Sequence, residues 1–217
     1  PPARDSIIAA LCATGLFPFI RQRPFGTVAD PLVQPRDIFV TAMDTSPLAP
    51  DQGLIVRDHE REFQRGIDVL AALTTGKVHL CVDGKPKESS FLADITNAEI
   101  HHFEGPHPAG NVGMHIHHVA PVNGVNDVVW HCTAQGVILI GRYFITGAPS
   151  FEVTVAVAGS AAARRRHVRT IAGAALSSFA EPSGEAGPVR CISGNVLTGR
   201  NAGADGFLGF TDTLVTL

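Results

Sequence analysis

The sequence is poor in cysteine and lacks a long hydrophobic run. Its four cysteines, at positions 12, 81, 132 and 191, are far apart and form no C-x-x-C motif. This spacing fits reduced cytosolic thiols better than a disulfide framework, an iron–sulfur site or a zinc module. No apolar run reaches the roughly 18–20 residues that a transmembrane helix requires, and the strongest one contains His131, Gln135 and Arg142. We therefore expect a soluble chain with no direct membrane span.

Aromatic and basic residues are also too scarce for a nucleic-acid partner. The 217 residues include one Trp and one Tyr, and the formal net charge is −3. Neither nucleic acid nor an anionic membrane is therefore expected as a partner. With 45% hydrophobic residues, the chain can still bury a substantial core. Its opening, PPARDSII, has neither an initiator Met nor a signal peptide, which predicts a piece of a longer protein.

In the first two thirds of the chain, helix-like and strand-like segments alternate. Apolar periodicity predicts helices over 3–14, 57–76, 87–95 and 134–147, and strands over 37–43, 77–83, 98–104 and 127–133. In the second of these helices, Phe63 and Ile67 belong to the apolar stripe, and Gly76 marks the end. Strands and helices that alternate at this spacing predict a Rossmann-like α/β domain with a parallel sheet.

From residue 147 onward the pattern changes to short strands. They are expected over 151–159, 166–173, 187–194 and 207–217, with one helix over 175–181. This content suits a small α+β module of the β-grasp type. The expected domains are a Rossmann-like domain over 1–149 and a β-grasp domain over 150–217. The basic run 163–169 is interpreted as a solvated strand edge, where cations discourage pairing with another sheet; the alternative is a surface for a partner or for lipid headgroups.

Residues 101–118, HHFEGPHPAGNVGMHIHH, contain six of the ten histidines. One interpretation is a metal-dependent enzyme in which His115, His117 and His118 are ligands. In a strand the first two share a face, but the Glu that follows H-x-H in cupin metal sites is missing; in a helix only the first and third share a face. We therefore expect a crossover between the third and fourth strands with capping or interface histidines, and the metal-dependent enzyme is the alternative.

Motifs for phosphate binding and covalent catalysis are missing. A nucleotide-binding fold usually carries glycines after its first strand, whereas Asp44, Pro47 and Pro50 follow the strand over 37–43. Proline offers no N–H donor, and an Asp carboxylate repels phosphate. The sequence also contains no G-x-S-x-G and no H-E-x-x-H motif. These residues indicate a nucleotide-binding type of fold without a phosphate site and without a covalent catalyst.

Several unusual strings give a specific resemblance. RPFGTV, IFVTAMDTSPLAP, GPHPAGNVGMHIHHVAPV and ISGNVLTG occur in this order along the chain. Together they resemble the NqrA family, whose members are subunits of the Na⁺-translocating NADH:quinone oxidoreductases. The resemblance implies a Rossmann-like domain related to the flavoprotein subunit of complex I, followed by a β-grasp domain of the soluble-ligand-binding (SLBB) type. It also implies that the chain is an internal fragment of an NqrA protein.

The same resemblance implies a function at the quinone end of a membrane complex. It implies a peripheral subunit on the cytoplasmic side of the bacterial inner membrane, in a complex that reduces ubiquinone and exports sodium. The expected partners are ubiquinone and the other subunits, especially the membrane-embedded subunit on the quinone side. NADH oxidation is expected in another subunit, and this fragment alone is not expected to be catalytic.

The resemblance also implies that this chain binds no redox cofactor. The flavoprotein relatives carry a Gly-rich FMN loop where this sequence has GLFPFIRQRPFGTV, residues 15–28. Phe17, Phe19 and Phe25 would fill space that a flavin needs. Neither FMN nor NAD is therefore expected here.

This loop holds the expected quinone-binding residues, Arg21, Arg23, Pro24 and Phe25. A guanidinium group can donate hydrogen bonds to quinone carbonyls, and a phenyl ring can stack on the quinone ring. The alternative is a surface loop that folds a Phe into the core. If the loop contacts quinone, alanine at the two arginines and at Phe25 weakens quinone binding.

Overall fold

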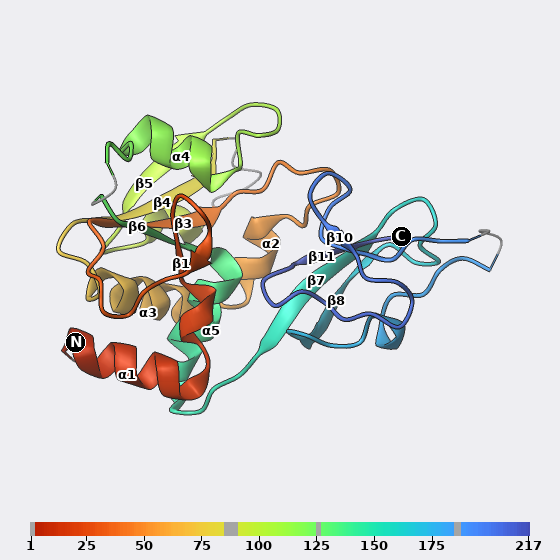
Figure 1. Cartoon of the computed structure of the whole chain (residues 1–217), viewed down its shortest axis with the longest axis horizontal. Coiled ribbons are helices and arrows are strands. Elements are labelled where there is room, and N and C mark those ends of the chain that lie inside the picture. Colours follow the sequence, from red (N-terminus) through yellow and green to blue (C-terminus); the bar gives the residue numbers. More distant parts are fainter. Residues whose placement is uncertain (1–2, 85–90, 125–126, 185–187) are drawn as a thin grey trace. The chain divides into compact units, whose positions relative to one another are not determined.

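The computed structural model describes residues 3–84, 91–124, 127–184 and 188–217. The chain forms two compact units (Figure 1). The first comprises Pro1–Thr45 and Gln52–Ser150, and the second comprises Ser46–Asp51 and Phe151–Leu217. The predicted domains differ from these units chiefly in the short segment Ser46–Asp51. No helix among the described residues is long and apolar enough to cross a bilayer.

The first unit is a mixed sheet with helices on both faces. Its helices are α1 (Arg4–Thr14), α2 (Gln52–Arg57), α3 (Glu60–Ala71), α4 (Val112–Val119) and α5 (Ala134–Thr146), with the 3-10 turns η1 (Phe17–Phe19) and η2 (Phe91–Asp94). Its strands are β1 (Arg21–Gln22), β2 (Thr27–Val28), β3 (Asp37–Ala42), β4 (Val78–Asp83), β5 (Glu99–Phe103) and β6 (Val129–Thr133). The strand order is β2-β1-β6-β3-β4-β5, in which the last four run parallel and the β1–β2 hairpin is antiparallel. The Rossmann-like parallel sheet is thus confirmed, with a hairpin added at one edge.

The parallel strands are apolar on both faces because helices cover both. In Figure 1, α3 and α5 lie on one face of the sheet and α4 lies on the other. Phe39, Cys81 and Val129 pack with Ile116 of α4 in one buried cluster. Val40, which points to the opposite face of β3, is also fully buried. Nearly continuous apolar runs such as these are typical of parallel strands covered on both sides.

Helices α3 and α5 pack against each other through two glycines. A Cβ at Gly66 would lie 2.2 Å from the Val137 carbonyl oxygen, and one at Gly141 would lie 1.8 Å from the Glu62 carbonyl oxygen. The backbones can approach this closely only because neither glycine has a side chain. Phe63, from the predicted apolar stripe of α3, is fully buried beside this contact.

The helix predicted over 57–76 is shorter at both ends. α3 runs from Glu60 to Ala71, and its predicted terminator, Gly76, lies well beyond it. The hydroxyl of Thr74 donates to the Arg36 carbonyl oxygen at 2.8 Å, which fixes the chain outside the helix. A Cβ at Gly76 would lie 2.0 Å from the same oxygen. Gly76 therefore permits a close contact between two loops and does not cap a helix.

Two further segments of the first unit differ from their predictions. Residues 15–28, expected to be a loop, contain the two-residue strands β1 and β2, which join the sheet through β6. Of the helix predicted over 87–95, residues 87–90 lie outside the described part of the chain. The described part that follows forms only the single turn η2.

The second unit is a small five-stranded sheet. Its elements are β7 (Glu152–Ala158), β8 (Arg166–Ile171), the 3-10 turn η3 (Leu176–Ser178), β9 (Ile192–Ser193), β10 (Arg200–Asn201) and β11 (Leu214–Thr216). The strand order is β10-β9-β11-β7-β8, and only the β11–β7 pair is parallel. The basic run lies partly on β8, an edge strand, where Arg166 and Arg169 are exposed. This position fits the interpretation of the run as a solvated strand edge.

The other predictions in the second unit overestimate regular structure. The strand predicted over 187–194 is limited to β9, with residue 187 outside the described part, and the strand predicted over 207–217 is limited to β11. The Ser193 hydroxyl donates to Asp212 at 2.6 Å and accepts from the Gly209 amide at 2.8 Å, which holds the segment before β11 as a loop. The helix predicted over 175–181 is only the turn η3.

Candidate functional site

The residues expected to bind quinone lie on and around the turn of the β1–β2 hairpin. β1 pairs antiparallel with β6, so that Gln22 lies opposite Trp130. The Arg23 amide then donates to the Val129 carbonyl oxygen at 2.9 Å. The turn therefore lies at the amino end of β6. Ligands of open α/β sheets usually bind at the carboxyl ends of the strands, so a contact at this turn would not use that crevice.

The turn is held in place by its own hydrogen bonds, while its aromatic ring faces solvent. The Arg21 Nε donates to the Gly26 carbonyl oxygen at 2.8 Å. Phe25 is 88% exposed, so the alternative in which this ring folds into the core is wrong. Phe17 and Phe19, just before the hairpin, fill the core instead. The hairpin thus presents one exposed phenyl ring on a defined turn.

His131 on β6 lies next to the arginines of the hairpin. It pairs in register with Arg21, and burial lowers the pKa of His131 to about 4, with the cations of Arg23 and Arg21 adding to the effect. The ring is therefore neutral at pH 7. His131 was not identified from the sequence, because its proximity to the arginines depends on the pairing of two-residue strands.

A cavity at the opposite, carboxyl edge of the sheet was not predicted. It measures about 330 Å³ and is lined by Met43, Thr45, Asp83, Glu104, Gly105 and Pro106. Two of its lining side chains, Asp83 and Glu104, are carboxylates. The Gly110 amide, on the glycine-rich loop after β5, donates to the Thr45 hydroxyl at 2.9 Å, and a Cβ at Gly110 would lie 2.6 Å from the Thr45 amide nitrogen. This loop is packed closely and leaves little room for a phosphate group.

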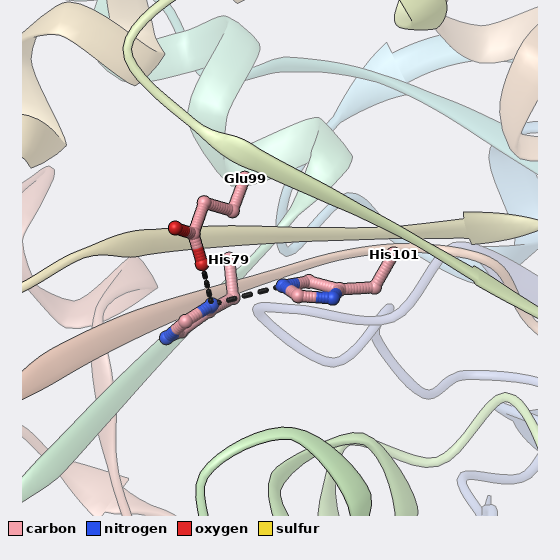
Figure 2. Close-up of side chains that lie close together, drawn as sticks. All are labelled: His79, Glu99 and His101. Carbon is pink, nitrogen blue, oxygen red and sulfur yellow. Dashed lines mark hydrogen bonds and ion pairs between the residues drawn. The ribbon is translucent and has the colours of Figure 1, made fainter.

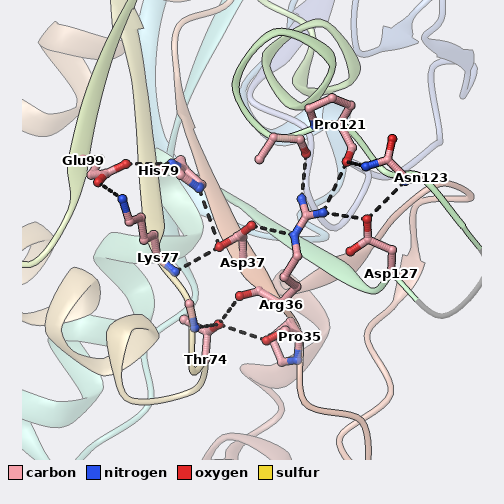
Figure 3. Close-up of polar contacts among 12 residues, drawn as sticks. Pro35, Arg36, Asp37, Thr74, Lys77, His79, Glu99, Pro121, Asn123 and Asp127 are labelled. Carbon is pink, nitrogen blue, oxygen red and sulfur yellow. Dashed lines mark hydrogen bonds and ion pairs between the residues drawn. The ribbon is translucent and has the colours of Figure 1, made fainter.

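A polar network occupies the amino ends of β3, β4 and β5 (Figure 3). Arg36 donates from Nε to Asp37 at 2.7 Å, from Nη1 to Asp127 at 2.6 Å and from Nη2 to the Ala120 carbonyl oxygen at 2.7 Å. The other oxygen of Asp37 accepts from the Lys77 amide at 3.0 Å. The network fixes the Asp37 carboxylate, whose side chain is only 11% exposed.

His79 on β4 lies at the centre of this network. Its Nε2 faces Asp37 Oδ1 at 3.7 Å, and its Nδ1 faces Glu99 Oε2 at 3.7 Å and His101 Nε2 at 3.0 Å (Figure 2). His79 is 4% exposed, and burial is the main cause that lowers its pKa. Burial also lowers the pKa of His101. Both rings are therefore neutral at pH 7.

The histidines of the predicted metal-site alternative lie on α4, the crossover helix between β5 and β6. His115 is fully buried against Phe103, with 4.4 Å between the ring centroids, whereas His117 and His118 are exposed. Among the described residues, the group of metal-ligand atoms that lie within 4.8 Å of one another consists of His79, Glu99 and His101. His79 and Glu99 lie opposite each other in the β4–β5 register, which the spacing along the sequence does not reveal.

Two buried histidines predict a loss of stability at mildly acidic pH. Burial lowers the pKa of both His115 and His131 to about 4, against 6.5 in the unfolded chain. Stability is therefore complete above pH 6.5 and falls as pH drops toward 4, because the unfolded chain binds these protons first. The free energy of unfolding should fall by at most about 1.4 kcal/mol per pH unit for each histidine. Urea midpoints at pH 7, 6 and 5 measure this slope.

The control for the pH prediction is the substitution His131→Gln, which removes one of the two titrating rings. This variant should lose less stability between pH 7 and pH 5 than the unsubstituted chain. Equal slopes for the two proteins, or a urea midpoint that is constant over this range, would contradict the prediction.

Comparison with known proteins gives a consistent set of relatives. A family model described as the NqrA second alpha/beta domain matches residues 3–149, and one described as the NQRA C-terminal domain matches residues 154–204. The NqrA subunit of the Na(+)-translocating NADH-quinone reductase of Vibrio alginolyticus is 42% identical over 209 residues, which are 95% of this chain and 46% of that protein. The corresponding protein of Alcanivorax borkumensis is 40% identical over 199 residues, which are 92% of this chain and 44% of that protein. The chain thus spans about half the length of the curated relatives it matches.

Solved structures share the fold at low sequence identity. The crystal structure of an NAD+-reducing [NiFe]-hydrogenase in the H2-reduced state matches with a TM-score of 0.63 and 14% identity, over 98% of this chain and 46% of that chain. The air-oxidized state of such a hydrogenase matches with the same TM-score and 16% identity. At this identity the likeness extends to the fold alone.

Proposed function

Because the chain belongs to the NqrA family, we propose that it functions within the NqrA subunit of a Na⁺-translocating NADH:quinone oxidoreductase and contributes to ubiquinone binding through the β1–β2 hairpin. The observation that carries this proposal is the exposed Phe25 ring on a turn that Arg21 fixes. A phenyl ring held in solvent is costly to maintain unless it has a binding partner, and a planar quinone ring is a suitable one. Arg23 supplies a guanidinium beside it that can donate to a quinone carbonyl.

The proposal assigns no flavin or nicotinamide cofactor to this chain. Asp83 and Glu104 line the cavity at the carboxyl edge, where an FMN or NAD phosphate would meet two like charges. The Gly110 amide is already paired with Thr45, so this glycine does not offer its N–H to a phosphate. Ubiquinone enters the proposal as a substrate of the complex.

The proposed setting is the cytoplasmic side of the bacterial inner membrane, with NqrA as a peripheral component. The proposed partners are the other subunits of the complex, and above all the membrane-embedded subunit on the quinone side. The names of the relatives in Vibrio and Alcanivorax support this setting, because each is the corresponding subunit of such a reductase. The chain's own contribution to turnover is to bind and orient quinone.

Trp130 provides an internal reporter for quinone binding at the hairpin. It is the single Trp of the chain, and it pairs in register with Gln22 of β1. A short-chain ubiquinone analogue bound at the turn should quench its fluorescence. Phe25→Ala should weaken the measured affinity roughly twofold to tenfold, since an aromatic stacking contact contributes about 0.5–1.5 kcal/mol.

The matched control is Leu32→Ala. Leu32 is an apolar side chain that is 91% exposed, close to the hairpin in sequence but outside its turn. Its replacement should leave the affinity unchanged. Unchanged affinity in Phe25→Ala, or an equal loss in both variants, would argue against quinone contact at this turn.

A further inference from the structure

Three metal-ligating side chains from neighbouring strands converge at the amino edge of the first unit's sheet. His79 lies opposite Glu99 in the β4–β5 register, and His101 follows two residues later on the same face of β5. Their ligand atoms all lie within 4.8 Å of one another (Figure 2). Two paired strands therefore hold the three side chains in place.

The distances are close to those of a bound transition metal. His79 Nδ1 and His101 Nε2 are 3.0 Å apart, and Glu99 Oε2 is 3.7 Å from His79 Nδ1. In a tetrahedral zinc site with Zn–N bonds of about 2.0–2.1 Å, two ligand nitrogens lie about 3.4 Å apart. Side-chain shifts of a few tenths of an ångström would bring the three atoms to that geometry. In the metal-free chain the short N···N distance is that of a hydrogen bond between the two rings.

Asp37 orients His79 in the way that metal-binding histidines are usually oriented. Its Oδ1 faces the other ring nitrogen, Nε2, at 3.7 Å. Asp37 is itself held by the Lys77 amide at 3.0 Å and by Arg36 Nε at 2.7 Å. A carboxylate at Nε2 favours the tautomer whose proton is on Nε2. The lone pair of Nδ1 then points toward Glu99 and His101.

From this geometry we propose that His79 Nδ1, His101 Nε2 and Glu99 Oε2 bind one divalent transition-metal ion, of which Zn²⁺ is the best match. Two imidazoles and one carboxylate suit zinc far better than calcium or magnesium, which prefer sets of oxygen ligands. The Glu99 side chain is 46% exposed, so an ion can enter from solvent and a water molecule can complete the fourth position. The site is separate from the hairpin, and it goes beyond the proposed function.

Lys77 opposes the ion. Its ammonium pairs with Oε1 of Glu99, and this hydrogen bond is the main cause that holds the pKa of the Glu99 carboxyl below its usual value. The carboxylate is therefore ready to bind a metal, but a cation already lies beside it. Removing this charge should strengthen metal binding, so Lys77→Gln should bind Zn²⁺ more tightly than the unsubstituted chain.

A bound ion would tie β5, the edge strand of the sheet, to β4. Its ligands come from both strands, and the ion adds side-chain bonds to the backbone ladder between them. Zn²⁺ binding should therefore raise the urea midpoint of the chain, because an ion that binds only the folded state stabilises it.

The test is calorimetric titration of Zn²⁺ into the full chain after chelator treatment, together with the visible absorption of the Co²⁺ form. We expect one equivalent to bind, with His101→Gln and Glu99→Gln each lowering the affinity at least about tenfold. Both substitutions are at positions that are not fully buried, and urea midpoints check that the variants fold. His102→Gln is the matched control, because His102 is the next residue of β5, exposed on the opposite face, and its loss should change nothing.

Three results would overturn the proposal. The first is no binding near one equivalent. The second is an equal loss of affinity in His102→Gln. The third is binding that disappears when His117 and His118 are both changed to Gln, since this would place the ion on α4. None of these outcomes bears on the quinone titration, so the metal site and the proposed function are tested separately.

Discussion

Gly141→Val should unfold the first unit. A Cβ at this position would lie 1.8 Å from the Glu62 carbonyl oxygen and 2.6 Å from the Gly66 amide nitrogen. Both atoms belong to the backbone of α3, so no side-chain rotation relieves the clash and the two helices must separate. Their separation would expose the buried face of α5, which includes Val137 and Ile140. We expect a loss above about 4 kcal/mol, a size reached only by exceptional substitutions.

Circular dichroism and urea unfolding measure this loss. Gly124→Ala is the matched control, since a Cβ at Gly124 meets nothing within 4 Å. We expect the control to unfold at the urea concentration of the unsubstituted chain. A Gly141→Val protein with a nearly unchanged midpoint would mean that α3 and α5 do not pack as closely as described.

Arg36→Ala should produce the second largest loss of stability. The substitution removes hydrogen bonds to Asp37, Asp127 and the Ala120 carbonyl oxygen, all between 2.6 and 2.7 Å. It also leaves the largely buried Asp37 carboxylate without its cation. Breaking a buried ion pair costs about 3–5 kcal/mol. The Arg36 side chain is 36% exposed, so screening by solvent reduces our expectation to about 2–3 kcal/mol.

Arg36→Lys distinguishes loss of geometry from loss of charge. A lysine ammonium cannot reach the three acceptors that the planar guanidinium bridges, so the variant should recover only part of the lost stability. Urea midpoints of the two variants measure the difference, and Arg61→Ala, at an exposed position of α3, is the control. Full recovery in Arg36→Lys would show that charge alone matters at this position.

The sequence predicted the parallel core of the first unit because its local signals agree with its tertiary structure. The strands over 37–43 and 77–83 are continuous apolar runs, which only a strand covered on both faces requires. Gly15 and Gly147, at the ends of α1 and α5, have φ values of 75° and 74°, which favour glycine and mark helix ends in the sequence. Thr133 caps α5 by accepting from the Gly136 amide.

Elements held by tertiary contacts were predicted less well. Strands β1, β2, β9 and β10 have two residues each, too few for a periodic pattern. α2 begins two residues after Pro50, in a segment rich in turn-forming residues. The predicted helix end at Gly76 was wrong because this glycine serves a contact with Arg36 that lies far away in sequence.

The candidate sites show the same division. The hairpin residues could be identified because Arg21, Arg23, Pro24 and Phe25 lie close together in the sequence. The metal-ligating group could not, because His79 and His101 are brought together only by the register of β4 and β5. Clustering along the sequence pointed instead to α4, where successive histidines face different environments.

The central claim is that the Phe25 turn contributes to quinone reduction by the complex. It is tested most directly by measuring NADH:ubiquinone turnover of the assembled complex with Phe25→Ala in NqrA. The account predicts that the KM for ubiquinone rises roughly twofold to tenfold, in line with the loss of one stacking contact. It also predicts an unchanged rate of NADH oxidation with an artificial acceptor. An unchanged KM for ubiquinone in a correctly assembled complex would contradict it.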